Sequence, residues 1–152
     1  MKKYEFTGET KRVELWNRTA MLHRIRATVE FGFVKVGELG GWIEKEENLS
    51  HEGKAWVWGN AEVCGDAKVC GDAKVFLASH VLVMGSVGSR NDFTTFFRDK
   101  DNEITVKCGC FLGKIDKFLE KVTQTHGNNK YALVYRAAVE VAKLQIELTE
   151  RK

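Results

Sequence analysis

The sequence predicts an α+β fold that is mainly β, in which a short parallel β coil lies between an N-terminal β region and a C-terminal unit with a β-hairpin and two helices. Two patterns lead to this prediction. Units of six residues repeat in the middle of the chain, and apolar residues recur at helical spacing near its end. We expect three parts, over residues 1–42, 43–84 and 85–152.

Residues 1–42 have the composition of β-structure. Apolar and other residues alternate over 3–6 and 22–27, which is the period of a strand, and residues 31–36 also have strand composition. Four glycines, at positions 32, 37, 40 and 41, are expected to mark bends. This part is therefore predicted to form strands joined by glycine turns.

The repeats begin clearly at Ala55, where the chain reads AWVWGN, AEVCGD, AKVCGD, AKVFLA and SHVLVM. In A-x-V-x the alternation is that of a strand with one buried face, and Gly-Asn or Gly-Asp has the chemistry of a tight turn. Strands this short cannot form a meander of hairpins, but they can coil as a solenoid. The segment resembles hexapeptide-repeat proteins that form left-handed parallel β-helices, in which three hexads make one triangular coil. A short left-handed parallel β-helix over residues 43–84 is the expectation.

The C-terminal part begins as β-structure and ends in helices. Residues 80–84 continue as a strand, and 93–98 and 103–108 form a predicted hairpin around DKDN. A first helix is predicted by apolar residues spaced i, i+3, i+4 and i+7, at Ile115, Phe118, Leu119 and Val122, and Gly127 is expected to end it. A second helix, over about 130–148, is apolar on more than one face, so we expect the β-helix and a second copy of the chain to cover it.

Several unusual segments extend a resemblance over most of the chain. They are LHRIRA at 22–27, LGGWIEKEENLSHEG at 39–53, the hexads, GSRNDFTTFF at 88–97 and KCGCFLGKIDKFLEKV at 107–122. The chain resembles a group of phage- and prophage-encoded proteins of unassigned activity. This resemblance implies a virus-encoded protein acting in a bacterial cytoplasm, and it supplies no catalytic residues.

The first candidate site is the outward face of the repeats. If the Ala and Val of each hexad point inward, Trp56 and Trp58 point outward. Three hexads later Lys74 and Phe76 lie on the same face, so we expect Trp56 beside Lys74 and Trp58 beside Phe76. An exposed aromatic face favours aggregation, so a subunit of a homo-oligomer or the C-terminal helices are expected to cover it. The alternative is that the aromatic side chains stack on a planar ligand such as a nucleobase, with Lys74 near its charge.

The second candidate site is the loop GSVGSRND at 85–92. A Gly- and Ser-rich loop that leaves a strand can direct several backbone N–H groups at one anion, with serine hydroxyls and an arginine beside them. The plainer interpretation is a turn closed by an ion pair between its Arg and Asp. Two arginines on a predicted strand add a further candidate positive patch, although they are also typical of a solvated face. The candidate anion-binding residues are Arg24, Arg26, Ser89, Arg90 and Thr94.

Composition and spacing argue against several other functions. The chain has 24 Lys and Arg against 21 Asp and Glu, a net charge of +3, which is too mild for us to expect a nucleic-acid or membrane partner. The longest apolar run is far shorter than a bilayer span, and the basic start is not followed by the apolar stretch of a signal peptide. The four cysteines lack C-x-x-C spacing, and the histidines show no ligand spacing, so we expect no metal and no cofactor.

The sequence favours a cytoplasmic, non-enzymatic binding protein. We expect it to antagonise host defence by sequestering a small anionic or nucleotide-like molecule at the interface of a homo-oligomer, with three copies favoured because triangular coils pack side to side. One alternative is a module that docks on a host protein through its aromatic face. Another is a reduced hexapeptide-repeat acyltransferase, in which His80 would act as the general base.

Overall fold

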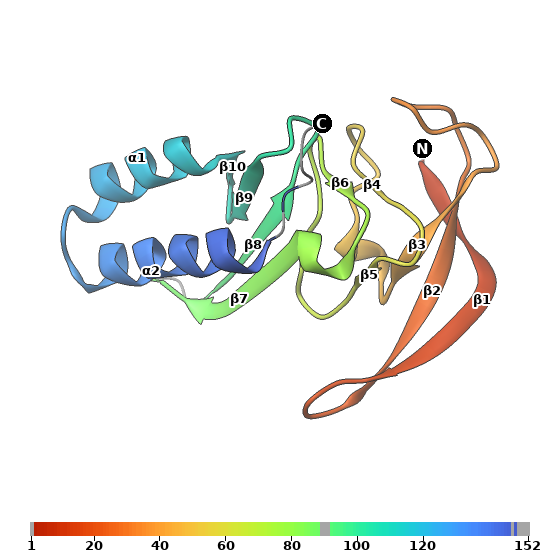
Figure 1. The fold of residues 1–152 in the computed structure, drawn as a ribbon, viewed down its shortest axis with the longest axis horizontal. Coiled ribbons are helices and arrows are strands. Elements are labelled where there is room, and N and C mark those ends of the chain that lie inside the picture. The colour runs from red at the N-terminus through yellow and green to blue at the C-terminus, as the bar shows by residue number, and fades with distance from the viewer. Residues whose placement is uncertain (1, 89–91, 147, 149–152) are drawn as a thin grey trace.

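The molecule is elongated, with a β-hairpin at one end and two helices at the other (Figure 1). The computed structural model describes residues 2–88, 92–146 and 148. Their strands form two four-stranded sheets, in the orders β1-β2-β3-β5 and β10-β9-β8-β7, and a two-stranded sheet of β4 and β6. The fold is therefore α+β, with most of its regular structure in strands.

The N-terminal sheet begins with a long hairpin. β1 (Tyr4–Glu14) pairs antiparallel with β2 (Thr19–Ala27), which pairs antiparallel with β3 (Leu39–Ile43). The strands predicted over 3–6 and 22–27 are confirmed. The far half of the hairpin extends away from the rest of the chain, and Trp16 in its turn is 97% exposed.

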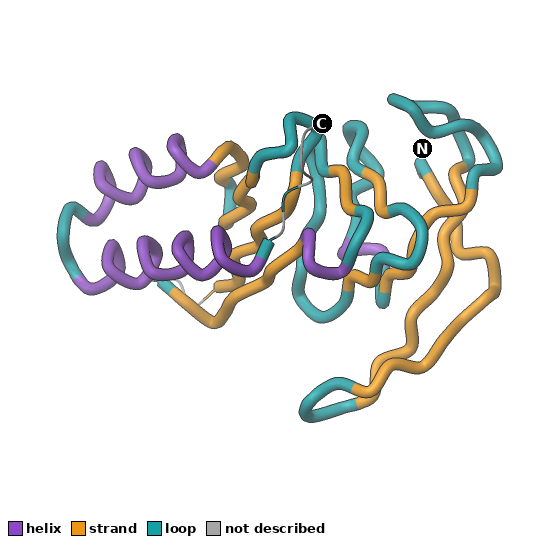
Figure 2. Tube along the Cα trace, in the orientation of Figure 1, coloured by secondary structure: helices purple, strands orange, loops and turns teal. Residues whose placement is uncertain are grey.

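The predicted left-handed β-helix is wrong. Between residues 55 and 76 the repeats form strands of only two residues, β4 (Trp56–Val57), β5 (Glu62–Val63) and β6 (Lys74–Val75), which are joined mainly by turns and loops (Figure 2). Among the described residues, parallel pairing is limited to β3–β5, β4–β6 and an isolated bridge from Leu49 to Val69. Each Gly-Asn or Gly-Asp turn leaves too few residues for continuous sheets, and β5 joins the N-terminal sheet instead. The sheets are consequently not those of a solenoid.

The inward positions of the repeats nevertheless follow the predicted alternation. The alanine and valine of each hexad are buried: Ala55, Val57, Ala61, Val63, Ala67, Val69, Ala73 and Val75. Residues 18 apart also pair as predicted, with Trp56 opposite Lys74 and Trp58 stacked on Phe76. The period-2 pattern thus predicted which Ala and Val side chains enter the core, although it did not predict the sheets.

Two glycines predicted as bends lie inside a strand. Gly40 and Gly41 are part of β3, and both positions require glycine because a side chain at either would collide with the neighbouring repeat. A Cβ on Gly40 would lie 2.7 Å from Trp56 Cζ2 and 2.8 Å from the Val57 carbonyl oxygen. The strand predicted over 31–36 is also wrong. Phe31 and Val34 instead exchange two backbone hydrogen bonds of 2.8 and 3.0 Å across a tight turn.

The C-terminal unit is an antiparallel sheet covered by helices. Its strands are β7 (Val81–Val87), β8 (Asp92–Arg98), β9 (Ile104–Cys108) and β10 (Phe111–Lys114). The predicted hairpin is confirmed by the pairing of β8 with β9. The helices are also confirmed: α1 (Ile115–His126) ends at Gly127, and α2 (Lys130–Gln145) begins at Asn129, whose side chain accepts the Ala132 N–H. Short 3-10 helices at Glu46–Asn48 and Ala78–His80 complete the fold.

Two main cores fill the molecule. The N-terminal core joins the first sheet to the repeats, and the C-terminal core lies between the second sheet and the helices. Phe97 of β8 packs in the N-terminal core, while its neighbour Phe96 packs in the C-terminal core. Successive side chains of a strand point to opposite faces, so β8 forms a wall shared by both cores.

Candidate functional site

A surface of aromatic and basic side chains lies where the repeats meet the turn that contains Phe33. We call it the aromatic–lysine face, and it consists of Phe33, Trp58, Phe76, Lys54, Lys74 and Lys100. Trp58 follows β4 and Phe76 follows β6, and the parallel pairing of these strands brings the two rings together. Their centroids lie 4.6 Å apart at an interplanar angle of 16°, which is a stacked pair.

The rest of the face surrounds this pair. Lys74 Nζ lies 4.6 Å from the centroid of Phe33, a cation–π contact, while 82% of Phe33 stays exposed. A cavity of about 70 Å³ lies between Phe33, Trp58 and the three lysines. The face therefore offers aromatic rings and ammonium groups to the same small volume.

The charge of the face is positive. Lys100 lies 3.6 Å from Asp72, so its charge is partly balanced. Within the part of the chain that the structure describes, no ion pair joins Lys54 or Lys74 to a carboxylate. Two ammonium groups are thus left to attract an anion.

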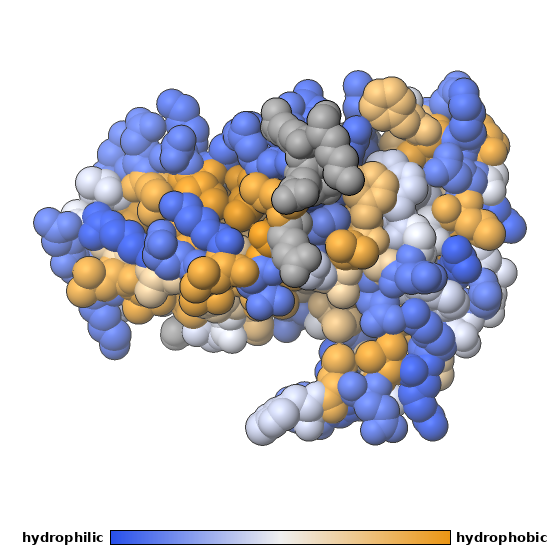
Figure 3. Space-filling view, in the orientation of Figure 1, coloured by the Kyte–Doolittle hydropathy of each residue, from blue (hydrophilic) through white to orange (hydrophobic). Residues whose placement is uncertain are grey.

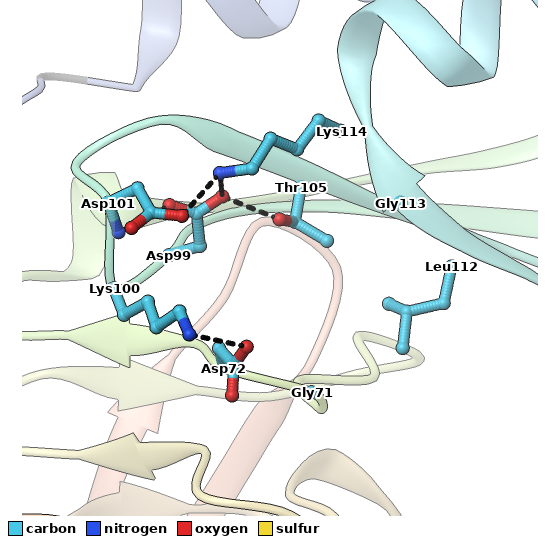
Figure 4. A pocket seen from close by; sticks show the side chains of 9 residues that line it. All are labelled: Gly71, Asp72, Asp99, Lys100, Asp101, Thr105, Leu112, Gly113 and Lys114. Atoms are coloured by element: carbon cyan, nitrogen blue, oxygen red, sulfur yellow. Dashed lines mark hydrogen bonds and ion pairs between the residues drawn. The ribbon is translucent and has the colours of Figure 1, made fainter.

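A polar pocket of about 200 Å³ adjoins the face and shares Asp72 and Lys100 with it (Figure 4). Asp99 lines this pocket and is 2% exposed. Its Oδ2 accepts hydrogen bonds from the Thr105 hydroxyl at 2.7 Å and from Lys114 Nζ at 3.1 Å. Its Oδ1 accepts the backbone N–H groups of residues 101 and 103 at 2.8 and 3.1 Å.

This hydrogen-bond network fixes the β8–β9 turn that carries Lys100. Burial lowers the pKa of Lys114, but hydrogen bonds to Asp101 and Asp99 outweigh it and hold that pKa above its usual value. Lys114 therefore stays charged, and both oxygens of Asp99 are occupied. The hydrogen bonds of Asp99 hold the turn that carries Lys100, and they leave Asp99 without a free oxygen that could act as an acid or base.

Of the residues predicted for the aromatic and anion sites, the structure brings together Trp58, Lys74 and Phe76. The prediction that Trp56 points outward is wrong. Trp56 is 0% exposed in the N-terminal core, because Gly40 makes room for it on the side that alternation assigned to solvent. The predicted aromatic face therefore includes Trp58 but not Trp56.

The two predicted arginines lie on the N-terminal sheet, and both contact groups of that sheet. Arg24 donates to the Gly40 carbonyl at 3.1 Å and lies over the Trp42 ring. Arg26 pairs with Glu5 at 2.6 Å. Neither lines the cavity of the aromatic–lysine face.

The predicted anion loop at 85–92 is wrong at both ends, because residues 85–87 belong to β7 and Asp92 belongs to β8. Thr94 is 1% exposed and lies beside Cys108 in the C-terminal sheet, so its hydroxyl faces no solvent. Ser89 and Arg90 lie outside the described residues. Sequence reasoning missed Phe33, Lys54 and Lys100, for which no local pattern signals that a distant turn will bring them to the repeats.

The two histidines near the repeats have structural contacts. His80 is 2% exposed, and its Nδ1 accepts the N–H groups of Phe76 and Leu77 at 3.0 and 3.2 Å. His51 lines a cavity of about 560 Å³, but its Nδ1 accepts the Lys3 N–H and its Nε2 lies 2.8 Å from Glu46. His80 is buried and accepts backbone N–H groups, and both ring nitrogens of His51 have partners. Neither histidine is therefore placed to act as a general base.

Neither a scan against protein-family models nor a search of curated proteins finds a match to this chain. Across residues 2–88, 92–146 and 148, no helix has the length and apolar character needed to cross a membrane. The same residues contain no group of three or more His, Cys, Asp or Glu side chains placed to hold a metal ion.

Proposed function

We propose that the protein is a non-enzymatic binding protein whose aromatic–lysine face takes a small anion carrying a planar ring, as a nucleotide does. The observation that carries this proposal is the stacked Trp58–Phe76 pair beside the ammonium groups of Lys54 and Lys74. Aromatic side chains bind nucleobases through their π-faces, at about 1–3 kcal/mol per base. The ammonium groups would hold a phosphate or carboxylate of the same molecule.

Binding without reaction is favoured by the groups around the face. Both carboxylate oxygens of the buried Asp99 accept hydrogen bonds, and the buried His80 accepts the Phe76 N–H through its Nδ1. The cavity of about 70 Å³ also covers little of a nucleotide, since ligand pockets usually measure about 300–1,000 Å³. We therefore propose that a second copy closes over the face, as the sequence predicts, only when the ligand is bound, and that the bound molecule is a host signal sequestered by a virus-encoded protein.

The test is a thermal-shift and calorimetric titration with four probes: a mononucleotide, a cyclic dinucleotide, an uncharged nucleoside and inorganic phosphate. We expect a nucleotide at about 100 times its Kd to stabilise the fold by about 2.7 kcal/mol, which raises Tm by about 5–10 °C. Nucleoside and phosphate should each give a smaller shift, because each has only one of the two features. If none of the four probes raises Tm or gives heat, the proposal is wrong.

Matched variants locate the binding. Trp58→Ala should abolish the nucleotide shift, while Trp16→Ala, which removes an indole that is 97% exposed on the hairpin, should keep it. Lys74→Met removes the charge and keeps an apolar stem over Phe33, and Lys117→Met on α1 is its control. A nucleotide shift that survives in Trp58→Ala and Lys74→Met would place the ligand elsewhere.

A second candidate function, docking on a host protein, is favoured by the apolar exposure of the same face. Phe33 is 82% and Phe76 42% exposed, which is typical of protein-binding patches. In that case nucleotides give no shift, and Phe33→Glu abolishes complex formation with the host protein while leaving Tm unchanged.

A further inference from the structure

α2 has two apolar faces, of which only one is covered. The covered face packs against the second sheet and α1, through Ala132, Tyr135, Ala138, Val139 and Ala142. Roughly opposite it lies a second stripe at spacing i, i+4, i+8 and i+11, formed by Leu133, Ala137, Val141 and Leu144. Leu133 is 60%, Val141 43% and Leu144 87% exposed. Figure 3 shows apolar surface along the two helices.

We propose that this outer stripe binds the outer stripe of a second copy of the chain, with the two α2 helices antiparallel about a two-fold axis. In that arrangement Leu133 of one copy lies opposite Leu144 of the other, and Ala137 lies opposite Val141. The small side chain at the centre lets the two helix backbones approach, and the larger side chains pack on either side. A two-fold interface requires such a self-complementary surface.

The charges beside the stripe are also complementary to those of a second copy. Arg136 and Glu140 lie one turn apart on the same flank of α2. An antiparallel pair places this flank beside the same flank of the other copy, so each Glu140 lies close to Arg136 of the partner helix, whereas a parallel pair would place the flank beside the opposite flank of the partner helix and lose this contact. Arg136 donates to the Gly127 carbonyl at 2.8 Å and to the Thr123 hydroxyl at 3.2 Å, so its guanidinium group is held beside the C-terminal end of α1, and Glu140 lies 3.5 Å from Lys143 of its own helix.

The small area of the stripe sets the expected affinity between the two copies. A single crossing of two helices buries less than the roughly 800 Å² per partner of a standard interface, so we expect a dimer that dissociates on dilution to about micromolar concentration.

The expectation of three copies rested on triangular coils, which the structure lacks. α2 lies at the end of the molecule opposite the N-terminal hairpin (Figure 1), and none of its residues lines the cavity of the aromatic–lysine face. This proposal therefore does not rest on the proposed function.

The test is sedimentation velocity of the full chain between about 1 and 200 µM. We expect the mass to rise from one chain to two. Leu144→Glu should stay at the mass of one chain throughout. Its matched control, Gln145→Glu, makes the same charge change at an exposed residue turned about 100° away, and it should dimerise as the wild type does.

Charge reversal tests the antiparallel arrangement. Glu140→Arg alone and Arg136→Glu alone should each weaken self-association at least tenfold, and an equimolar mixture of the two should recover a dimer, with circular dichroism checking that each variant is folded. A wild type that stays at one chain at about 200 µM overturns the proposal, as does a Leu144→Glu variant that dimerises normally. A mass of three chains, or no recovery in the mixture, overturns the two-fold arrangement.

Discussion

Replacing Trp56 tests the position of this residue in the N-terminal core. Its ring is 0% exposed and meets the rings of Tyr4 and Phe31 edge-on, with centroids 6.3 and 5.3 Å away. Removal of a buried tryptophan side chain costs about 3–5 kcal/mol. For a chain of this length, Trp56→Ala should therefore lower Tm by about 6–20 °C.

Trp56→Phe separates packing from hydrogen bonding. Within the described residues, the indole N–H of Trp56 is buried and has no hydrogen-bond partner. The smaller ring leaves about 40 Å³ unfilled, which costs about 1 kcal/mol at about 24 cal/mol per Å³. Removing a buried unsatisfied donor returns about 1–3 kcal/mol. We therefore expect Trp56→Phe to be within about 1 kcal/mol of the wild type, or more stable.

The assay is urea unfolding followed by far-ultraviolet circular dichroism, because fluorescence would change with the number of tryptophans. Trp16→Ala is the control, since its side chain is 97% exposed and its loss should change stability by no more than about 0.5 kcal/mol. If Trp56→Ala unfolds at the same urea concentration as Trp16→Ala, Trp56 is not a core residue. If Trp56→Phe is as unstable as Trp56→Ala, the argument from the unsatisfied N–H is wrong.

Three further predictions concern stability. Gly40→Ala should destabilise the fold by about 1–3 kcal/mol in urea unfolding, because its Cβ would lie 2.7 Å from Trp56, and an unchanged midpoint would contradict this. The hydrogen bond from Arg18 lowers the pKa of Glu44 from 4.5 to about 2, so this carboxylate stabilises the fold above about pH 4.5 and the contribution is lost as pH falls towards 2. Glu44→Gln should accordingly be less stable than the wild type at pH 7, by a margin that shrinks below pH 4.5; a margin independent of pH would refute this. Asp99→Asn places an amide against donors and should cost about 2–4 kcal/mol, measured by calorimetry, with a loss below about 0.5 kcal/mol as the contrary outcome.

Local patterns predicted much of the C-terminal unit. The hairpin over 93–108 and both helices follow from spacing and from residues such as Gly127 that act within one turn of the chain. The sheets of the repeats could not be predicted from local patterns, because the pairing of two-residue strands depends on which strands the flanking segments bring beside them. Trp56 illustrates this: alternation places it outward, but β3 lies against that side, so both sides of β4 are buried.

Part of the candidate site could likewise be predicted from local patterns, and part of it could not. The contact of Trp58 with Phe76 could be predicted from the 18-residue spacing of the repeats. Phe33 could not, because its turn reaches the repeats only through the tertiary fold. Arg24 and Arg26 were candidates for an anion site, but the register of β1 against β2 places carboxylates beside them, and no sequence pattern gives that register.

The shared wall formed by β8 couples the melting of the two halves. Phe96 and Phe97 are adjacent in the chain but lie in different cores, so loss of order in either half removes a large side chain from the other. Unfolding of one half alone would leave β8 with an apolar side facing water. Heating should consequently give a single cooperative calorimetric transition, with equal calorimetric and van't Hoff enthalpies.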